Sequence, residues 1–179
     1  MPERLTTDRL LLSPPVAADI PNIVRLAGNE AVSRTTANLP HPYAEADAVH
    51  WLNAANKGRA AGTQHVFAIR DKTTGELMGG IGLHVNKVFN IAELGYWVGQ
   101  PYWGKGYVTE AAREILRFAF GPLGLRKVEA HYMAVNPASG RVMEKIGMQR
   151  EGLLRQHIER DGVVNDVIVY GVLAEELVG

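Results

Sequence analysis

The chain contains no cysteine among its 179 residues. It therefore cannot form a disulfide, bind a metal ion through thiolates or use a thiol nucleophile in covalent catalysis, and this composition fits a reducing compartment. Lysine plus arginine and aspartate plus glutamate number 19 each, so the formal net charge is zero. No overall electrostatic field attracts nucleic acid or an anionic membrane, and we expect neither as a partner.

Long apolar runs are also missing. The N-terminus lacks the apolar stretch of a signal peptide, and no segment reaches the roughly 20 apolar residues that span a membrane. The six histidines show neither H-x-x-x-H nor H-x-H spacing, which predicts no metal site. We expect a soluble, cytoplasmic protein with one domain over residues 1–179, because domains of roughly 100–200 residues are the norm.

Hydrophobic periodicity and turn residues predict alternating strands and helices. The expected strands are 9–15, 66–69, 77–85, 91–98, 127–135 and a final hairpin of 156–159 and 163–173. The expected helices are 19–28, 45–57 ending at Gly58, about 108–119 and 136–147. Residues 33–43 are expected to form a loop. The order β-α-α-β-β-β-α-β-α-β-β predicts an α/β (α+β) fold, with a single mixed, mostly antiparallel sheet flanked by about four helices.

Particular residues make these expectations specific. The inward faces of the second and last helices are expected to be Val49, Leu52 and Ala55, and Ala138, Val142 and Ile146, respectively. Asp19 and Asn136 are expected to cap the helices that follow them. Gly79, Gly80 and Gly82 within one strand indicate a bulge or a close approach of backbones.

Residues 96–112 (YWVGQPYWGKGYVTEAA) stand out as a strand, a glycine-rich turn and the start of an amphipathic helix. Apolar residues recur along one face of that helix, and charged residues fill the opposite face. Gly104 and Gly106 leave backbone N–H groups uncovered at the helix N-terminus, where the helix dipole adds partial positive charge. The segment therefore predicts a site for an anion, most often phosphate.

Two well-known phosphate loops fit this segment poorly. Residues 99–106 nearly match the P-loop pattern G-x-x-x-x-G-K-S/T, but Gly106 stands where the Mg²⁺-binding Ser or Thr belongs. Residues 104–109 could begin the G-x-G-x-x-G pattern of a dinucleotide fold, but Thr109 replaces the third glycine. The segment also lies mid-chain rather than in a first βαβ unit. Both alternatives are disfavoured.

The segment 102–111 (YWGKGYVTEA) resembles the acetyl-CoA pyrophosphate loop of the GCN5-related N-acetyltransferase (GNAT) superfamily. Four further segments support the resemblance at compatible spacing: 7–10 (TDRL), 92–98 (AELGYWV), 136–148 (NPASGRVMEKIGM) and 151–152 (EG). They look most like the branch with the ribosomal-protein N-terminal (alanine/serine) acetyltransferases of the RimJ/RimL type. The resemblance covers essentially the whole chain and implies the GNAT fold, acetyl-CoA as co-substrate and no metal.

The resemblance implies a cofactor site around the turn and the last helix. Its expected residues are Trp97, Val98, Gly99, Trp103, Gly104, Lys105, Gly106, Tyr107, Val108, Thr109, Asn136 and Ser139. One departure concerns the family pattern Q/R-x-x-G-x-G/A, because Pro101 stands where Gln or Arg belongs and Gln100 lies one residue early. A homodimer is also compatible with the resemblance.

The implied reaction is direct attack of an amine on the acetyl thioester. The resemblance gives a backbone N–H near Val98 the task of polarising the carbonyl. Glu93 is the candidate general base, with a water relay as the alternative. Ser139 is the candidate proton donor to the departing thiolate, with Tyr132 as the alternative. His41, Arg34, Thr35 and Thr36 are interpreted as either solvated loop or acceptor contacts.

The acceptor is expected to be an α-amine, either of a ribosomal protein or of a small amine. An α-amine with a pKa near 8 is about 10% neutral at pH 7, against about 0.04% for a lysine amine. Two other hypotheses stay open. The glycines of residues 77–85 leave room for a longer acyl chain on the donor, and a non-catalytic CoA-binding sensor or scaffold would keep the same motifs.

Overall fold

A computed structural model describes residues 4–177 of the chain. The strands are β1 (Leu5–Thr6), β2 (Leu10–Ser13), β3 (Gln64–Asp71), β4 (Leu77–Asn86), β5 (Ile91–Val98), β6 (Lys127–Met133), β7 (Gln149–Arg160) and β8 (Val163–Leu173). The α-helices are α1 (Ile20–Ala27), α2 (Glu30–Arg34), α3 (Glu45–Ala61), α4 (Tyr107–Phe120) and α5 (Pro137–Lys145).

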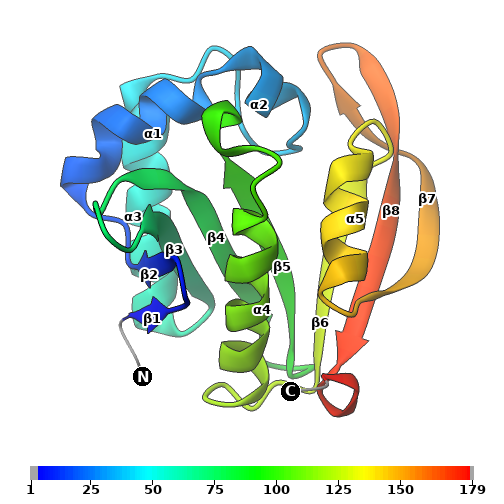
Figure 1. Cartoon of the computed structure of the whole chain (residues 1–179). Helices are drawn as coiled ribbons and strands as arrows, with labels where there is room; N and C mark the ends of the chain where they lie inside the picture. The colour runs from blue at the N-terminus through cyan, green and yellow to red at the C-terminus, as the bar shows by residue number, and fades with distance from the viewer. Residues whose placement is uncertain (1–3, 178–179) are drawn as a thin grey trace.

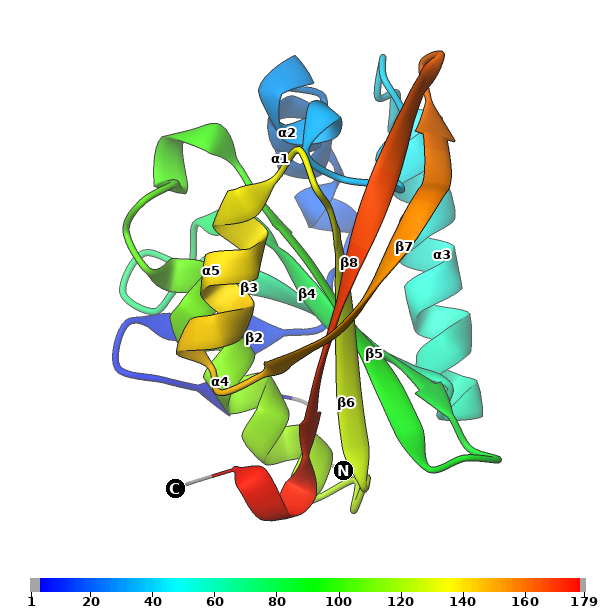
Figure 2. The ribbon, with the colours of Figure 1, turned by 90° about the vertical axis from the view of Figure 1, so that its right-hand side faces the viewer.

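The eight strands form one sheet in the order β1-β2-β3-β4-β5-β6-β8-β7. Six neighbouring pairs are antiparallel, and β5 and β6 are parallel. Helices α4 and α5 cover one face of the sheet and α3 covers the other (Figures 1 and 2). The predicted mixed, mostly antiparallel sheet is confirmed. The short α2 makes five α-helices within residues 4–177, against the expected four.

Helix α4 carries the main hydrophobic core. The apolar face predicted for it is buried, and it packs against Phe67, Leu83 and Leu94 of the sheet. Each large apolar side chain buried in this way contributes roughly 1.5–3 kcal/mol. Helices α1 and α3 bury a smaller cluster on the other face, around Ile23 and Ala68. Both faces of the sheet are therefore packed, which fixes the position of its central strands.

The central parallel pair β5–β6 parts before its strands end. Ile91–Leu94 pair with Lys127–Ala130, and the pairing stops there. The antiparallel neighbours continue further, because β4 pairs with β5 as far as Val98 and β6 pairs with β8 as far as Met133. Residues 95–98 thus keep one hydrogen-bonded neighbour and lose the other. This opening lies directly before the glycine turn.

Two details of the helix predictions were wrong. Helix α3 passes through Gly58 and ends at Ala61, where Gly62 adopts φ +65°. Gly58 stays helical because its missing side chain makes room for Gln64, whose Cβ would lie 2.6 Å from a methyl group there. Val49, expected inward, is 38% exposed, and Ala48 is buried instead.

The buried face of α5 is rotated from the predicted one. Ser139, Met143 and Ile146 are buried, whereas Ala138 is exposed. Gly147 follows with φ +88°, as predicted for a left-handed cap. The rotation turns the Ser139 hydroxyl toward the sheet.

The two expected side-chain caps do not form. Asp19 occupies the N-cap position of α1, but its carboxylate pairs with Arg70 at 2.7 Å and accepts the Val16 N–H at 2.8 Å. Asn136 occupies the N-cap position of α5, and its side chain also bonds elsewhere. Arg70 and the preceding Val16 N–H thus engage the Asp19 carboxylate, and a distant carbonyl engages the Asn136 amide, in place of a side-chain cap.

Strand boundaries at the sheet edges were also mispredicted. Strand β7 begins at Gln149 rather than residue 156, β6 ends at Met133 rather than residue 135, and β1 was not expected. The alternation of β7 is weak because it is an edge strand with mostly exposed side chains, and two register irregularities interrupt it. The predicted loop 33–43 begins two residues later, after α2 ends at Arg34.

The glycines of β4 are explained by close packing. A methyl group at Gly79 would lie 2.2 Å from the Trp97 carbonyl oxygen, and one at Gly80 would lie 2.8 Å from the Trp97 indole nitrogen. At Gly82 it would lie 2.9 Å from the His65 carbonyl oxygen. The predicted close approach is confirmed. Backbone and indole fill the space, so these glycines do not leave room for a longer acyl chain.

Replacing Gly79 with alanine tests this packing. We expect Gly79→Ala to lower the free energy of unfolding by about 1–3 kcal/mol, because the methyl group must push β4 away from β5. Urea denaturation measures the change. Gly95→Ala is the matched control on the adjoining strand, since nothing lies within 4 Å of its added methyl group. Equal stabilities of the two variants would contradict the packing argument.

Candidate functional site

The glycine turn leaves the N-terminus of α4 uncapped. After β5, a short 3₁₀ turn spans Gln100–Tyr102, and Gly104 and Gly106 then adopt φ +72° and +78°. Gly106 is the N-cap of α4, and no side chain caps this end. Trp103 and residues 104–106 are exposed. Uncapped N–H groups at the positive end of a 14-residue helix form a suitable site for an anion.

Side-chain contacts hold the turn in place. The Trp103 indole donates to the Val98 carbonyl at 2.9 Å, and Asn29 donates to the Gln100 side chain at 2.9 Å. Tyr102 donates to Glu76 at 2.6 Å. Gln100 thus has a structural partner on the neighbouring helix–loop segment, and Pro101 lies inside the 3₁₀ turn. The turn is therefore well anchored even though Pro101 departs from the family pattern.

Ser139 meets a tyrosine that the sequence did not single out. Its Oγ lies 2.6 Å from the hydroxyl oxygen of Tyr96, and the Tyr96 hydroxyl also lies 3.3 Å from the Ser139 carbonyl oxygen. Burial raises the pKa of the Tyr96 hydroxyl to about 12, and the hydrogen bond with Ser139 opposes this only partly. Two neutral hydroxyl groups therefore connect α5 with the part of β5 that lacks β6 as a neighbour.

Asn136 lies beside the same opening and links it to α2. Its Nδ2 donates to the Thr35 carbonyl at 3.1 Å, directly after α2. The side chains of Trp97 and Val98 point to opposite faces of β5. Val98 packs on the core beneath α4, whereas Trp97 packs against the cluster of α1 and α3. The Trp97 indole is therefore separated from the glycine turn by the sheet.

Glu93 lies on the sheet face opposite α4, with a histidine that was also not predicted. Its Oε1 is 3.5 Å from Nδ1 of His131 on β6, and 53% of the Glu93 side chain is exposed. With about half of its side chain in solvent, the Glu93 carboxylate bears little desolvation cost, so burial gives no argument for a function. Ser139 and Glu93 occupy opposite faces of the sheet, on either side of the point where β5 and β6 part.

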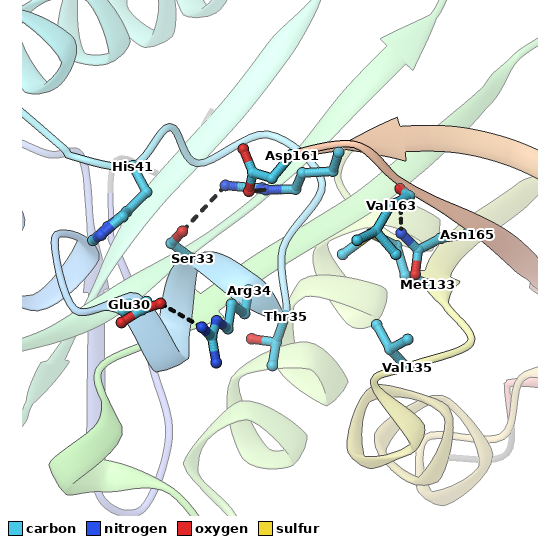
Figure 3. Close-up of a pocket in the computed structure, with 11 residues that line it drawn as sticks. Glu30, Ser33, Arg34, Thr35, His41, Met133, Val135, Asp161, Val163 and Asn165 are labelled. Carbon is cyan, nitrogen blue, oxygen red and sulfur yellow. Dashed lines mark hydrogen bonds and ion pairs between the residues drawn. The ribbon is translucent and has the colours of Figure 1, made fainter.

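A cavity of about 650 Å³ lies between α2 and the ends of β6 and β8. Figure 3 shows Glu30, Ser33, Arg34, Thr35 and His41 on one side and residues of β6 and β8 on the other. The walls carry both charge signs, with an Arg34–Glu30 ion pair at 2.5 Å. The cavity's apolar lining residues are Met133, Val135 and Val163. Thr35, which lines the cavity, is the residue that Asn136 holds.

Arg160 fastens the loop that borders this cavity. Its guanidinium donates to the carbonyl oxygens of Thr36 and Leu39 and, at 3.2 Å, to the Ser33 hydroxyl. Arg160 lies at the end of β7, far from α2 in sequence. Arg160, near the tip of the β7–β8 hairpin, and Asn136 thus both bond to the loop that follows α2.

Comparison with known proteins assigns the family. Residues 9–149 match the family model described as "Acetyltransferase (GNAT) domain". This chain belongs to the GNAT family. It is 30% identical over 172 residues to the uncharacterised N-acetyltransferase YoaA of Bacillus subtilis, and the match covers 94% of this chain and 96% of that one.

Two further comparisons agree. The chain is 27% identical over 120 residues to the [Ribosomal protein uS5]-alanine N-acetyltransferase of Escherichia coli, which covers 66% of this chain and 62% of that one. A crystal structure of a GNAT-family acetyltransferase from Bacillus anthracis matches with a TM-score of 0.86 and 26% identity, over 97% of this chain and 99% of that chain. The protein is an acetyl-CoA-dependent N-acetyltransferase.

The GNAT fold brings some predicted site residues together and separates others. The glycine turn and the Ser139–Asn136 end of α5 flank the parting of β5 and β6, whereas Glu93 and the Trp97 indole lie on the opposite face. Within residues 4–177, no cluster of acidic residues and histidines has the geometry of a metal site. No helix in that range is long and apolar enough to cross a membrane.

Tyr96 and His131 were missed for different reasons. Tyr96 lies within the motif of residues 96–112, but only the rotation of α5 shows that it contacts Ser139. His131 lies 38 residues after Glu93, and only the parallel β5–β6 register makes them neighbours. Alternation along β6 puts His131 on one face of the strand, but it does not show that Glu93 lies beside it.

The raised pKa of Tyr96 predicts a pH-dependent contribution to stability. The folded enzyme keeps this proton at pH values where the unfolded chain, with a tyrosine pKa near 10, has lost it. The contribution is complete below about pH 10 and falls as the pH rises toward 12. We expect the unfolding free energy of wild type to fall by about 2 kcal/mol more than that of Tyr96→Phe over this interval. Urea denaturation of both proteins measures this, and parallel pH profiles would contradict it.

Proposed function

We propose that this GNAT enzyme transfers acetyl directly from acetyl-CoA to an α-amine, with a protein N-terminus as the first choice of acceptor. The observation that carries the proposal is the arrangement around the parting of β5 and β6. A phosphate-binding turn and two hydroxyl groups lie on one face, and a carboxylate lies on the other. A donor threaded through the opening would present its thioester between them.

The donor site follows from the backbone. The pyrophosphate binds the uncapped N–H groups of Gly104, Gly106 and the first turn of α4. The pantetheine arm lies along residues 95–98, whose backbone has lost β6 as a neighbour. The N–H of Val98 or its neighbour polarises the acetyl carbonyl. Asn136 borders this path, and Trp97 contributes through its backbone.

The departing thiolate needs a proton, and the Ser139–Tyr96 pair provides a route. The Tyr96 hydroxyl is protonated at neutral pH, as any tyrosine with a pKa near 10 is, and burial raises its pKa further, to about 12. Ser139 lies in the first turn of α5, 2.6 Å from this hydroxyl, so the contact can relay a proton from Tyr96 to Ser139 as Ser139 gives its own to sulfur. Ser139 thus acts as the proximal donor. Tyr132, the earlier alternative, packs beside Gly140 and Tyr170 instead.

The groups available to remove the proton favour an acceptor amine of low pKa. Glu93 is accessible to water and takes the proton through an ordered water, with the His131 imidazole beside it. Carboxylate and imidazole are weak bases compared with a lysine amine. A substrate that is already about 10% neutral at pH 7, as an α-amine is, needs little help. A relative named for acetylating the alanine of ribosomal protein uS5 supports the same class.

The cavity beside α2 is the proposed acceptor site. Its volume of about 650 Å³ lies within the range for small ligands and accommodates the end of a peptide. Arg34, Thr35 and His41 line it, so three of the four residues left open as acceptor contacts belong to this wall. The alternative of a longer acyl donor has lost its structural basis in β4. The sensor alternative predicts donor binding without turnover.

An acceptor screen tests the proposal. With acetyl-CoA as donor, we expect thiol release with a peptide that begins with alanine or serine. We expect release to be lower by about a hundredfold with the same peptide blocked at its N-terminus and carrying one lysine, because far less lysine amine is neutral. Free amino acids and aminoglycosides test the small-amine acceptors.

Thermal shift with acetyl-CoA, succinyl-CoA and desulfo-CoA accompanies the screen. Binding without turnover on every acceptor would favour the sensor. No binding of any CoA compound would overturn the donor assignment. Preference for the lysine peptide would overturn the α-amine assignment alone.

Substitution of Glu93 tests the base. We expect Glu93→Gln to lower kcat by about a hundredfold and to change the acid limb of the pH–rate profile, because proton removal from the amine is impaired. Glu129→Gln is the matched control, since Glu129 pairs with Glu93 in the β5–β6 register and contacts Lys127 at 3.0 Å. A Glu93→Gln profile that superimposes on wild type would remove Glu93 from the mechanism.

A further inference from the structure

The N-terminal segment grips the first turn of α4 through Glu110. The Glu110 carboxylate accepts the Thr7 hydroxyl at 2.5 Å, the Arg9 backbone N–H at 2.9 Å and Arg9 Nε at 2.7 Å. Arg9 Nη1 donates to the Lys105 carbonyl at 3.0 Å, inside the glycine turn. The Arg9 guanidinium also lies 4.6 Å above the Tyr107 ring. One arginine therefore contacts the turn, the first residue of α4 and its first acidic residue.

Glu110 poses an electrostatic problem for an anion at this helix end. Its backbone N–H bonds to the Gly106 carbonyl, so its carboxylate belongs to the first turn of α4. A carboxylate here suits the helix dipole but repels a phosphate. Burial acts to raise the pKa of Glu110, but the Thr7 and Arg9 hydrogen bonds and the Arg9 charge outweigh it and lower the pKa. Glu110 is therefore ionised at neutral pH, and its charge is balanced by Arg9.

The third guanidinium nitrogen points to the mouth of the helix. Arg9 Nη2 lies 3.6 Å from where a Cβ of Gly106 would be, and within residues 4–177 it has no hydrogen-bond acceptor. About half of the Arg9 side chain is exposed, at 48%. A fixed guanidinium whose Nη2 N–H groups are unused is well suited to a phosphate oxygen.

We propose that Arg9 is a donor-binding residue, which contacts a phosphate of CoA through Nη2 and neutralises Glu110 through Nε. This inference rests on the proposed donor site at the N-terminus of α4. The pair Thr7–Arg9 holds the carboxylate of Glu110 with the N-terminal segment, and the net charge beside Gly106 stays favourable to phosphate. Sequence separation hides the relation, because Arg9 and Glu110 are 101 positions apart in the chain.

A brace that only stabilises the fold would produce the same contacts, and donor chemistry separates the two roles. Acetyl-CoA carries the phosphates, whereas S-acetyl-pantetheine carries the same thioester without them. A donor-binding Arg9 affects only acetyl-CoA. A structural brace affects both donors in parallel, through kcat or through the fraction of folded enzyme.

The experiment measures Kd for CoA by calorimetry, and KM and kcat with both donors. We expect Arg9→Gln to raise Kd for CoA and KM for acetyl-CoA about tenfold, the worth of one charge-assisted hydrogen bond, with kcat unchanged. Its kcat/KM with S-acetyl-pantetheine should match wild type. Arg9→Lys should recover part of the loss, since a point charge remains without the fork. Arg113→Gln, on the same helix and donating to the Lys145 carbonyl, is the control.

The variant Glu110→Gln, which retains Arg9, provides an independent test. Removing the carboxylate charge should lower Kd for CoA about threefold. The double variant Arg9→Gln, Glu110→Gln should bind CoA more tightly than Arg9→Gln alone. If Arg9→Gln does not fold, Glu110→Gln decides, and unchanged or weaker binding overturns the inference.

The outcomes distinguish the role of Arg9 from the existence of the donor site. Wild type that binds CoA, together with Arg9→Gln that binds it equally well, overturns the role of Arg9 and leaves the donor site intact. Equal losses with acetyl-CoA and S-acetyl-pantetheine also overturn it. Wild type that binds no CoA overturns the donor site and this inference together.

Discussion

The parting of β5 from β6 is the constraint on which the rest of this enzyme depends. Four residues of each strand form a parallel ladder, and then β5 follows β4 while β6 follows β8. The packed helices on both faces fix the two halves of the sheet, so the opening is built into the fold. Backbone polar groups that have lost a neighbouring strand need another partner, and the pantetheine arm of the donor is suited to supply it.

Other features are placed by this opening. The glycine turn follows β5 directly, which puts the positive end of α4 at the mouth. Helix α5 follows β6, and its buried face directs Ser139 to Tyr96 across the same opening. Asn136 and Arg160 both bond to the loop after α2, which fixes one wall of the cavity proposed for the acceptor. The proposed donor and acceptor sites thus share one framework.

Local patterns were informative where the physical cause is local. The α4 stripe, the close approach at Gly79 and the cap at Gly147 follow from side-chain spacing or from the φ and size of glycine. Predictions were wrong where a distant partner competes with a local rule. Asp19 pairs with Arg70 rather than capping α1, and Gly58 accommodates Gln64 rather than ending α3. The weak alternation of β7 hid an edge strand.

The sequence by itself determined the family and the glycine turn, because the backbone conformations and the helix end are encoded within one short segment. It also carried Glu93 and Ser139 as candidates through their motif positions. Only the tertiary structure decided which residues meet them. Tyr96 with Ser139, His131 with Glu93 and Arg9 with Glu110 are pairs distant in sequence. Their proximity is set by strand register and helix rotation, and a single-residue shift in either would turn these side chains away.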